Sequence, residues 1–203
     1  MTCDGDVRLQ KPLVFVLIAG ALLTIIGLGF VALTRVEEND AFCASCHSQP
    51  EAAYFGRAQS SAAIDLASAH AMLAHTKPQL ANTRCIDCHA GPGLMGRVSS
   101  VSLGARDAIR WFSGTSIQPA QQTTSINDAN CLKCHADTPN ANSFDQHFHA
   151  TLARWQRADA AAATCVTCHA AHITGGNAAL GFILQQRTQD VCKRCHTALG
   201  VDK

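Results

Sequence analysis

The chain divides into one long apolar segment near its start and a longer, more polar remainder. The segment Pro12–Thr34 contains no charged residue, and its length exceeds the about 20 residues with which an α-helix crosses a bilayer. We predict a transmembrane helix here. The alternative is a cleaved signal peptide, whose apolar stretch normally has only about 7–15 residues. We therefore treat residues 1–35 as N-terminus plus anchor and residues 36–203 as one domain.

Charges on the two sides of the apolar segment predict its orientation. Arg8 and Lys11 precede it, whereas Arg35 is followed at once by Glu37 and Glu38. Positive residues favour the cytoplasmic side of a membrane. We predict a single-pass protein of the cytoplasmic (inner) membrane, embedded in the lipid bilayer, with its N-terminus inside and residues 36–203 on the periplasmic side.

Apolar positions after the anchor recur at helical spacing between Gly and Pro breaks. They predict a fold that is mostly α with long loops, a small domain on one N-terminal transmembrane helix. The polar stretch Gly114–Asn130 is predicted as a connection. The expected helices cover Ser61–Leu80, Ser99–Phe112, Ser143–Ala163 and Asn177–Arg187.

The composition shows that few large side chains are present to fill a hydrophobic core. The chain has only eight Phe, two Trp and one Tyr, but eleven Cys. A net charge of +1 gives no indication of a nucleic-acid partner, and we expect none.

Ten of the cysteines occur in five copies of Cys-x-x-Cys-His. Two cysteines at this spacing bind the two vinyl groups of one haem, and the histidine that follows binds its iron. We predict five covalently bound haem c groups, packed as the core of the domain. Cys3 is left over, and no structural disulfide is expected. The motifs are Cys43–His47 with Cys46, Cys85–His89 with Cys88, Cys131–His135 with Cys134, Cys165–His169 with Cys168, and Cys192–His196 with Cys195.

Paired cysteines also suit zinc or a redox dithiol. Five pairs cannot be divided evenly into four-cysteine zinc sites, and neither alternative needs a histidine after every second cysteine. The motifs begin 42, 46, 34 and 27 residues apart, so we interpret the repeat as chemical, not structural.

Five further histidines match the five motifs in number, and we predict them as distal iron ligands. His147 and His149 lie two positions apart, about 200° around a helix, and therefore face two different haems. Met72 and Met95 are alternative thioether ligands, mostly for the first haem. The five histidines are His70, His75, His147, His149 and His172.

The anchor, the motif Phe42–His47 just outside it, and the run Cys165–His172 together resemble the NapC/NirT/NrfH family of membrane-anchored multihaem quinol dehydrogenases. The resemblance covers roughly residues 12–175. It implies electron transfer from menaquinol or ubiquinol of the membrane quinol pool, near the first haem, to a periplasmic redox partner protein, and a place in a membrane complex.

The chain departs from the family at two places. Ser48-Gln49-Pro50 stands where members have a methionine, so the distal ligand of the first haem is open. The fifth motif is absent from tetrahaem members, and the chain resembles a pentahaem variant. Polar groups near the first haem that suit quinol protons are Asp87, Arg97, Arg106 and Asp107.

Two other functions are open at this point. One is a haem wire fed by a partner protein without quinol oxidation. The other is a multihaem enzyme of the nitrite or hydroxylamine type, which requires an iron with an open position; the five spare histidines make this the weaker hypothesis. No catalytic residue is assigned.

Overall fold

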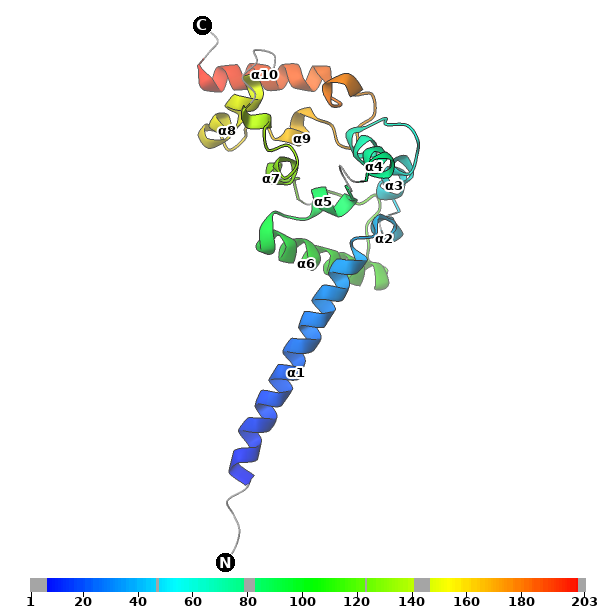
Figure 1. Ribbon diagram of the computed structural model, residues 1–203, viewed down its shortest axis with the longest axis vertical. Coiled ribbons are helices and arrows are strands. Elements are labelled where there is room, and N and C mark those ends of the chain that lie inside the picture. Colours follow the sequence, from blue (N-terminus) through cyan, green and yellow to red (C-terminus); the bar gives the residue numbers. More distant parts are fainter. Residues whose placement is uncertain (1–6, 47, 79–82, 123, 141–146, 201–203) are drawn as a thin grey trace, which may run out of the picture.

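The computed structural model describes residues 7–46, 48–78, 83–122, 124–140 and 147–200. This part of the chain is mostly helical, which confirms the predicted fold class. Among these residues the β-structure is limited to isolated bridges that pair Ile183 with His169 and with Asn177. Figure 1 shows one long helix projecting from a group of short helices joined by long connections.

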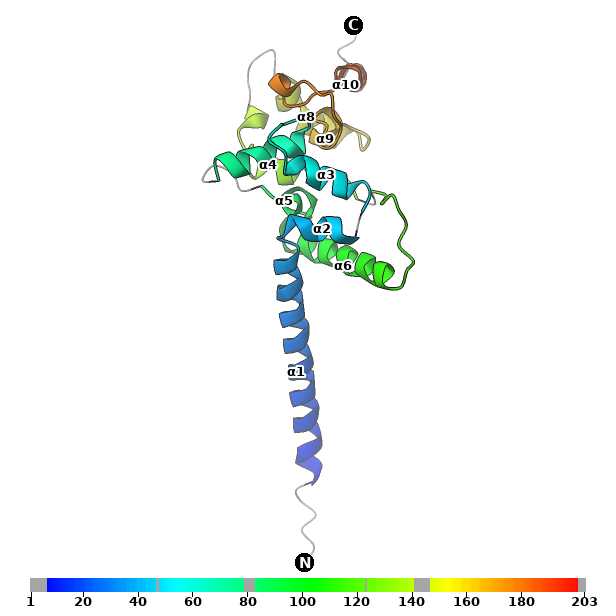
Figure 2. The same ribbon diagram turned by 90° about the vertical axis from the view of Figure 1, so that its right-hand side faces the viewer.

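The long helix is α1, Val7–Val36. Its segment Pro12–Val36 has a mean hydropathy of 2.7 and is not covered by the rest of the chain. By length and composition the segment suits a membrane anchor, and a signal sequence near an N-terminus has the same properties. Figure 2 shows that α1 stands clear of the other helices over most of its length.

The remaining helices are short because the haem motifs and Gly or Pro breaks interrupt the chain every few turns. They are α2 (Asp40–Cys46), α3 (Glu51–Ala58), α4 (Leu66–Thr76), α5 (Cys85–His89), α6 (Gly93–Phe112), α7 (Asp128–Leu132), η1 (Thr138–Asn140), α8 (His147–Ala158), α9 (Cys165–Cys168), η3 (Ala178–Leu180) and α10 (Gln185–Leu199).

Helix α4 begins later than the sequence pattern predicted. Asp65 is its N-cap and accepts a hydrogen bond from the backbone N–H of Ser68, while the Ser68 hydroxyl interacts with the backbone N–H of Asp65. This capping box satisfies free N–H groups of the first turn and sets the start of the helix at Leu66. The predicted start at Ser61 lies in the loop before it.

Helix α6 begins earlier than predicted, at Gly93 instead of Ser99. The backbones of Gly91 and Gly96 touch, so that a side chain at either position would collide with the other glycine. The pair of glycines therefore permits a sharp turn from α5 directly into α6.

The predicted helix Asn177–Arg187 is divided in two. Gly181 and Phe182 have φ angles of 65° and 62°, which ends η3 before α10 starts. A helix cannot continue through two residues in the left-handed region. Helix α10 then carries the whole of the fifth motif.

The polypeptide buries few of its own apolar side chains. The largest cluster joins Trp155, Ala163 and Val191, with Cys168 and Cys195 packed against it. Among the described residues the buried hydrophobic side chains are Ala58, Val101, Trp155, Ala163, Ala170, Phe182 and Val191. A core this small buries little apolar surface for a domain of this size, so covalently bound groups are needed to complete it.

Candidate haem sites

Each of the five motifs overlaps a helix. The second, fourth and fifth begin in α5, α9 and α10, the cysteines of the first lie at the end of α2, and the third begins in the last turn of α7. Residues three apart in a helix share one side, so the two thiols face the same way in the four motifs whose cysteines both lie in a helix. In α5, for example, Cys85 and Cys88 stand one turn apart and His89 ends the helix. In the third motif Cys134 lies beyond the end of α7. The ten motif cysteines are free thiols, as covalent attachment to a porphyrin requires.

The motifs contact one another in chain order. The thiol of Cys43 hydrogen-bonds that of Cys85, and this hydrogen bond lowers the pKa of Cys43. Asn130, just before the third motif, donates to the backbone oxygens of Cys88 and Ala90 at 2.8 and 2.6 Å. Motif helices one to three therefore form a continuous series.

The series continues to the C-terminal end. The thiol of Cys131 hydrogen-bonds that of Cys165 and so raises the pKa of Cys165. Burial, and next the nearby thiol of Cys192, raise the pKa of Cys168, and α9 packs on α10. Figure 1 shows the motif helices α2, α5, α7, α9 and α10 progressing away from α1.

Motifs one and two are joined in the same way as motifs three and four. Asp40 accepts a hydrogen bond from the backbone N–H of Cys85 at 2.9 Å, and Asp128 accepts one from Cys165 at 2.8 Å. Each aspartate lies three residues before the first cysteine of the preceding motif. The interpretation of the repeat as chemical and not structural was therefore wrong for this contact, which occurs twice.

A short sequence repeat accompanies these two aspartates. Asn39-Asp40-Ala41 and Asn127-Asp128-Ala129 precede the first and third motifs, and in each the asparagine oxygen accepts from the alanine N–H. The recurrence of Asn-Asp-Ala-x-Cys was the signal that identifies these residues from sequence. The unequal motif spacing concealed it.

Four of the spare histidines lie opposite a motif histidine. A metal–imidazole bond is about 2 Å long and the ring centre lies about 1.1 Å behind the bonding nitrogen, so two imidazoles on opposite sides of one metal have ring centres about 6.2 Å apart. The observed separations agree with this value. They are 6.1 Å for His70 and His135, 6.1 Å for His89 and His172, 6.1 Å for His149 and His169, and 6.3 Å for His147 and His196.

Backbone carbonyls orient two of these rings. His70 Nδ1 lies 2.9 Å from the backbone oxygen of Leu66, and His169 Nδ1 lies 2.7 Å from that of Gly181. A histidine whose Nδ1–H donates to a carbonyl presents its Nε2 lone pair to a metal. Both rings are thus held in the orientation that iron ligation needs.

Burial keeps two other histidines neutral. It is the main cause that lowers the pKa of His172 to about 4, and it also lowers the pKa of His149. Their Nδ1 atoms are buried without a hydrogen-bond partner. Neutral imidazole is the form that binds a metal, so both side chains suit an axial position.

Other predicted site residues are not placed opposite a motif histidine. His47 and Cys3 lie outside the described residues. His75 is exposed on the last turn of α4, and no ring contact with a motif histidine is found for it in the described part of the chain. Of the thioether alternatives, Met95 is exposed and Met72 is half-buried.

The donor groups fit haem better than a bare metal ion. Among the described residues no three His, Cys, Asp or Glu side chains converge on one point, whereas a structural zinc site has four protein ligands. Two facing imidazoles supply only the axial positions of an iron whose other four ligands come from a porphyrin. The paired thiols beside them supply the covalent links.

The model of the doubled Cys-x-x-Cys-His motif matches residues 158–200, which include the fourth and fifth motifs. This doubled motif indicates a multihaem c-type cytochrome. Electron transfer through covalently bound haem c is its function. No curated protein and no solved structure matches the chain.

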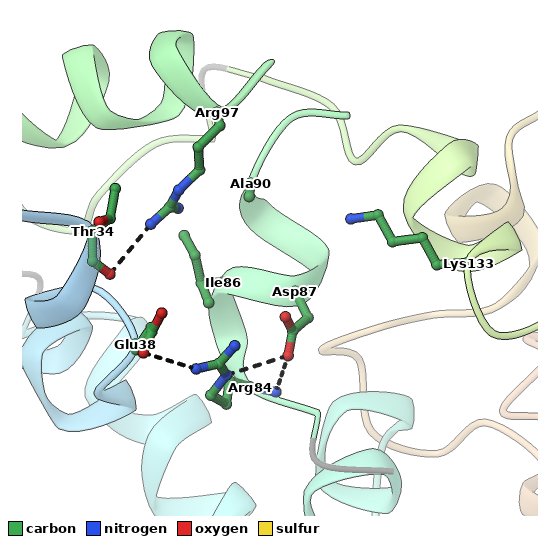
Figure 3. A pocket seen from close by; sticks show the side chains of 8 residues that line it. All are labelled: Thr34, Glu38, Arg84, Ile86, Asp87, Ala90, Arg97 and Lys133. Atoms are coloured by element: carbon green, nitrogen blue, oxygen red, sulfur yellow. Dashed lines mark hydrogen bonds and ion pairs between the residues drawn. The ribbon is translucent and has the colours of Figure 1, made fainter. Parts of the chain in front are cut away.

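A cavity of about 220 Å³ lies between the end of α1 and the second motif. Arg84 forms ion pairs with Glu38 at 3.4 Å and with Asp87 at 3.5 Å, as Figure 3 shows. Arg84 and Ile86, the sequence neighbours of Cys85, both line the cavity. Its lining residues are Thr34, Glu38, Arg84, Ile86, Asp87, Ala90, Arg97 and Lys133.

The four polar residues predicted near the first haem separate into two pairs. Asp87 and Arg97 line the cavity, whereas Arg106 and Asp107 pair with each other at 3.3 Å on α6 and do not line it. Glu38 and Arg84 were missed by the sequence analysis. Neither belongs to a motif. Arg84 lies three residues before Asp87, at the N-cap of α5, and the turn of the chain after α1 brings Glu38 to Arg84.

Proposed function

We propose that this chain is a membrane-anchored pentahaem cytochrome that oxidises quinol and delivers electrons to a periplasmic protein. The observation that carries this proposal is the series of motif contacts, which runs in chain order away from the end of α1. Such a series suits transfer of electrons from a site beside the membrane to a partner at the far end.

The chain's own residues would hold the haems by two kinds of bond. The paired cysteines would form the thioether links, and the motif histidines, His47 included, would each ligate an iron. His70, His172, His149 and His147 would supply the second histidine ligands, each paired with the motif histidine it faces. His75 is assigned by count to the first haem. Bound haem c supplies reversible one-electron redox chemistry.

The anchor is supported by the way α1 joins the domain. Glu37, directly after the apolar segment, pairs with Arg97 of α6 at 2.8 Å, and Arg97 also donates to the backbone oxygen of Thr34 at 3.4 Å. A helix retained in the mature protein keeps both contacts. The charges flanking α1 favour an N-terminus in the cytoplasm and a haem domain in the periplasm.

The cavity at the end of α1 is the quinol site that we propose. Each quinol that is oxidised releases two protons and two electrons. Asp87 and Glu38 are carboxylates that can take up these protons, and Arg84 holds both in place. Arg84 and Ile86, on either side of Cys85 in the sequence, line the cavity, and the Cys85 thiol contacts that of Cys43.

Direct reduction by a quinol tests this function. The purified full-length protein, with its haems, is placed in lipid vesicles without oxygen, and menadiol is added while the haem absorbance is followed. We expect rapid reduction, slowed about 10²-fold by Asp87→Asn; asparagine keeps an oxygen that can accept from the Arg84 N–H. Asp107→Asn, outside the cavity, is the matched control.

A protein that dithionite reduces but menadiol does not contradicts quinol oxidation. That result instead favours a carrier fed by a partner protein. Equal slowing by Asp87→Asn and Asp107→Asn places the quinol elsewhere than in this cavity.

A further inference from the structure

Helix α6 has one continuous apolar face. Its apolar positions recur at intervals of three and four residues, which places them on one side of a helix. The opposite side carries Arg106 and Arg110, with Asp107 paired to both. The apolar positions are Leu94, Val98, Val101, Ala105, Ala108, Ile109 and Phe112.

Only the middle of this face is covered by protein. Val101 is 6% exposed, whereas Leu94 is 74%, Ile109 70% and Phe112 87% exposed. Leu94 and Phe112 lie about five full turns apart and therefore on the same side of the helix. Both ends of α6 thus present large apolar side chains on one face, with no described part of the chain against them.

Helix α6 is fastened across the end of α1. Arg97 pairs with Glu37 at 2.8 Å, and a side chain at Gly104 would lie 3.1 Å from the same carboxylate. Arg97 and Gly104 form the row next to the apolar face on the helix surface. Contact with α1 therefore occurs beside that face, near Val101, and leaves its two ends free.

Figures 1 and 2 both show α6 lying across the end of α1, nearest of the domain helices to its uncovered length. The exposed apolar surface of α1 and that of α6 therefore adjoin. A helix of this kind, with an apolar side and a charged side, is stable in the interface plane of a bilayer.

We propose that α6 lies in the surface of the bilayer that α1 spans, with Leu94, Ile109 and Phe112 inserted among the lipid acyl chains. The occupant of this face is thus lipid. The inference rests on the proposed anchoring of α1. It gives the domain a second attachment to the membrane, which keeps the cavity beside Asp87 at the height of the membrane surface.

Photo-crosslinking in the full-length, haem-loaded protein tests this placement. Benzoylphenylalanine replaces Phe112 in one variant and Leu94 in another, and each is reconstituted in phosphatidylcholine vesicles, irradiated and examined by mass spectrometry. Leu23 of α1 is the positive control. Leu180, 59% exposed in η3 at the far end of the domain, is the negative control.

We expect lipid adducts at Phe112, Leu94 and Leu23 and none at Leu180. Adducts at Leu23 but at neither position of α6, or adducts of α6 with protein only, overturn the proposal while leaving the anchor intact. A lack of adducts at Leu23 overturns the anchor itself, and with it the placement of α6.

Discussion

Tyr54 lies parallel to His172, with the two ring centroids 4.1 Å apart and the planes tilted by 3°. Arg57 contacts both residues of this pair. Its guanidinium lies 4.9 Å from the Tyr54 ring centroid, and it donates a hydrogen bond to the backbone oxygen of His172 at 2.9 Å. Arg57 itself pairs with the buried Asp65 at 2.9 Å. The stack therefore fixes the plane of the ring that faces His89.

Replacement of Tyr54 tests whether the stack orients His172. Stacked aromatic rings contribute about 0.5–1.5 kcal/mol beyond their burial, and we expect Tyr54→Leu to lower stability by about this amount. Electron paramagnetic resonance should also show one altered low-spin haem signal. Tyr54→Phe keeps the stack and serves as the control; a signal unchanged in Tyr54→Leu contradicts a positioning role.

Asp128 joins the third and fourth motifs, because it accepts from the Cys165 N–H at 2.8 Å and from Gln156 at 2.7 Å. Removal of the carboxylate leaves the half-buried Cys165 N–H without its partner, at a cost of about 1–3 kcal/mol. We expect Asp128→Ala to lower the midpoint of denaturant unfolding, followed by circular dichroism. The exposed Asp137→Ala is the matched control, and equal midpoints for the two variants disprove the link.

The sequence was sufficient to predict the apolar helix, the mostly helical fold and the five motifs. The positions of His147 and His149 on opposite sides of a helix also followed from their spacing, and the structure directs them to His196 and His169 respectively. These features depend on local periodicity alone.

Which segments meet did not follow from local pattern. His172 faces His89 across 83 positions of sequence, because Arg57 and the hydrogen bond from Ala67 to the Ala171 oxygen hold the loop after the fourth motif against α3 and α4. Likewise Glu38 reaches Arg84 only through the turn after α1. Long-range contacts of this kind depend on the whole fold, not on the residues beside them.

His75 decides how the first haem is completed. By count it is the fifth distal ligand, although it is exposed on α4. If the count holds, His75→Ala converts one haem to high spin and leaves the signals of the four facing pairs unchanged. An entirely low-spin spectrum in this variant removes His75 from the ligand set and makes Met72 or Met95 the next candidates to be replaced.

The angles between facing imidazoles predict distinct spectra for individual haems. The planes of His70 and His135 are at 90°, whereas those of His149 and His169 are at 5°. In low-spin ferric haem each imidazole interacts most with the iron d orbital perpendicular to its own plane. Parallel planes act on the same orbital and separate it from its partner in energy, while perpendicular planes act on both and leave them nearly equal.

The haem at Cys131 and Cys134 should therefore give a strongly anisotropic low-spin signal with a large maximum g value, and the haem at Cys165 and Cys168 an ordinary rhombic one. His70→Ala should remove the first signal and His149→Ala the second, each with the appearance of one high-spin haem, because an axial ligand is lost. These two variants act as controls for one another. If His70→Ala removes a rhombic signal and leaves the strongly anisotropic one, His70 is not the ligand held perpendicular to His135.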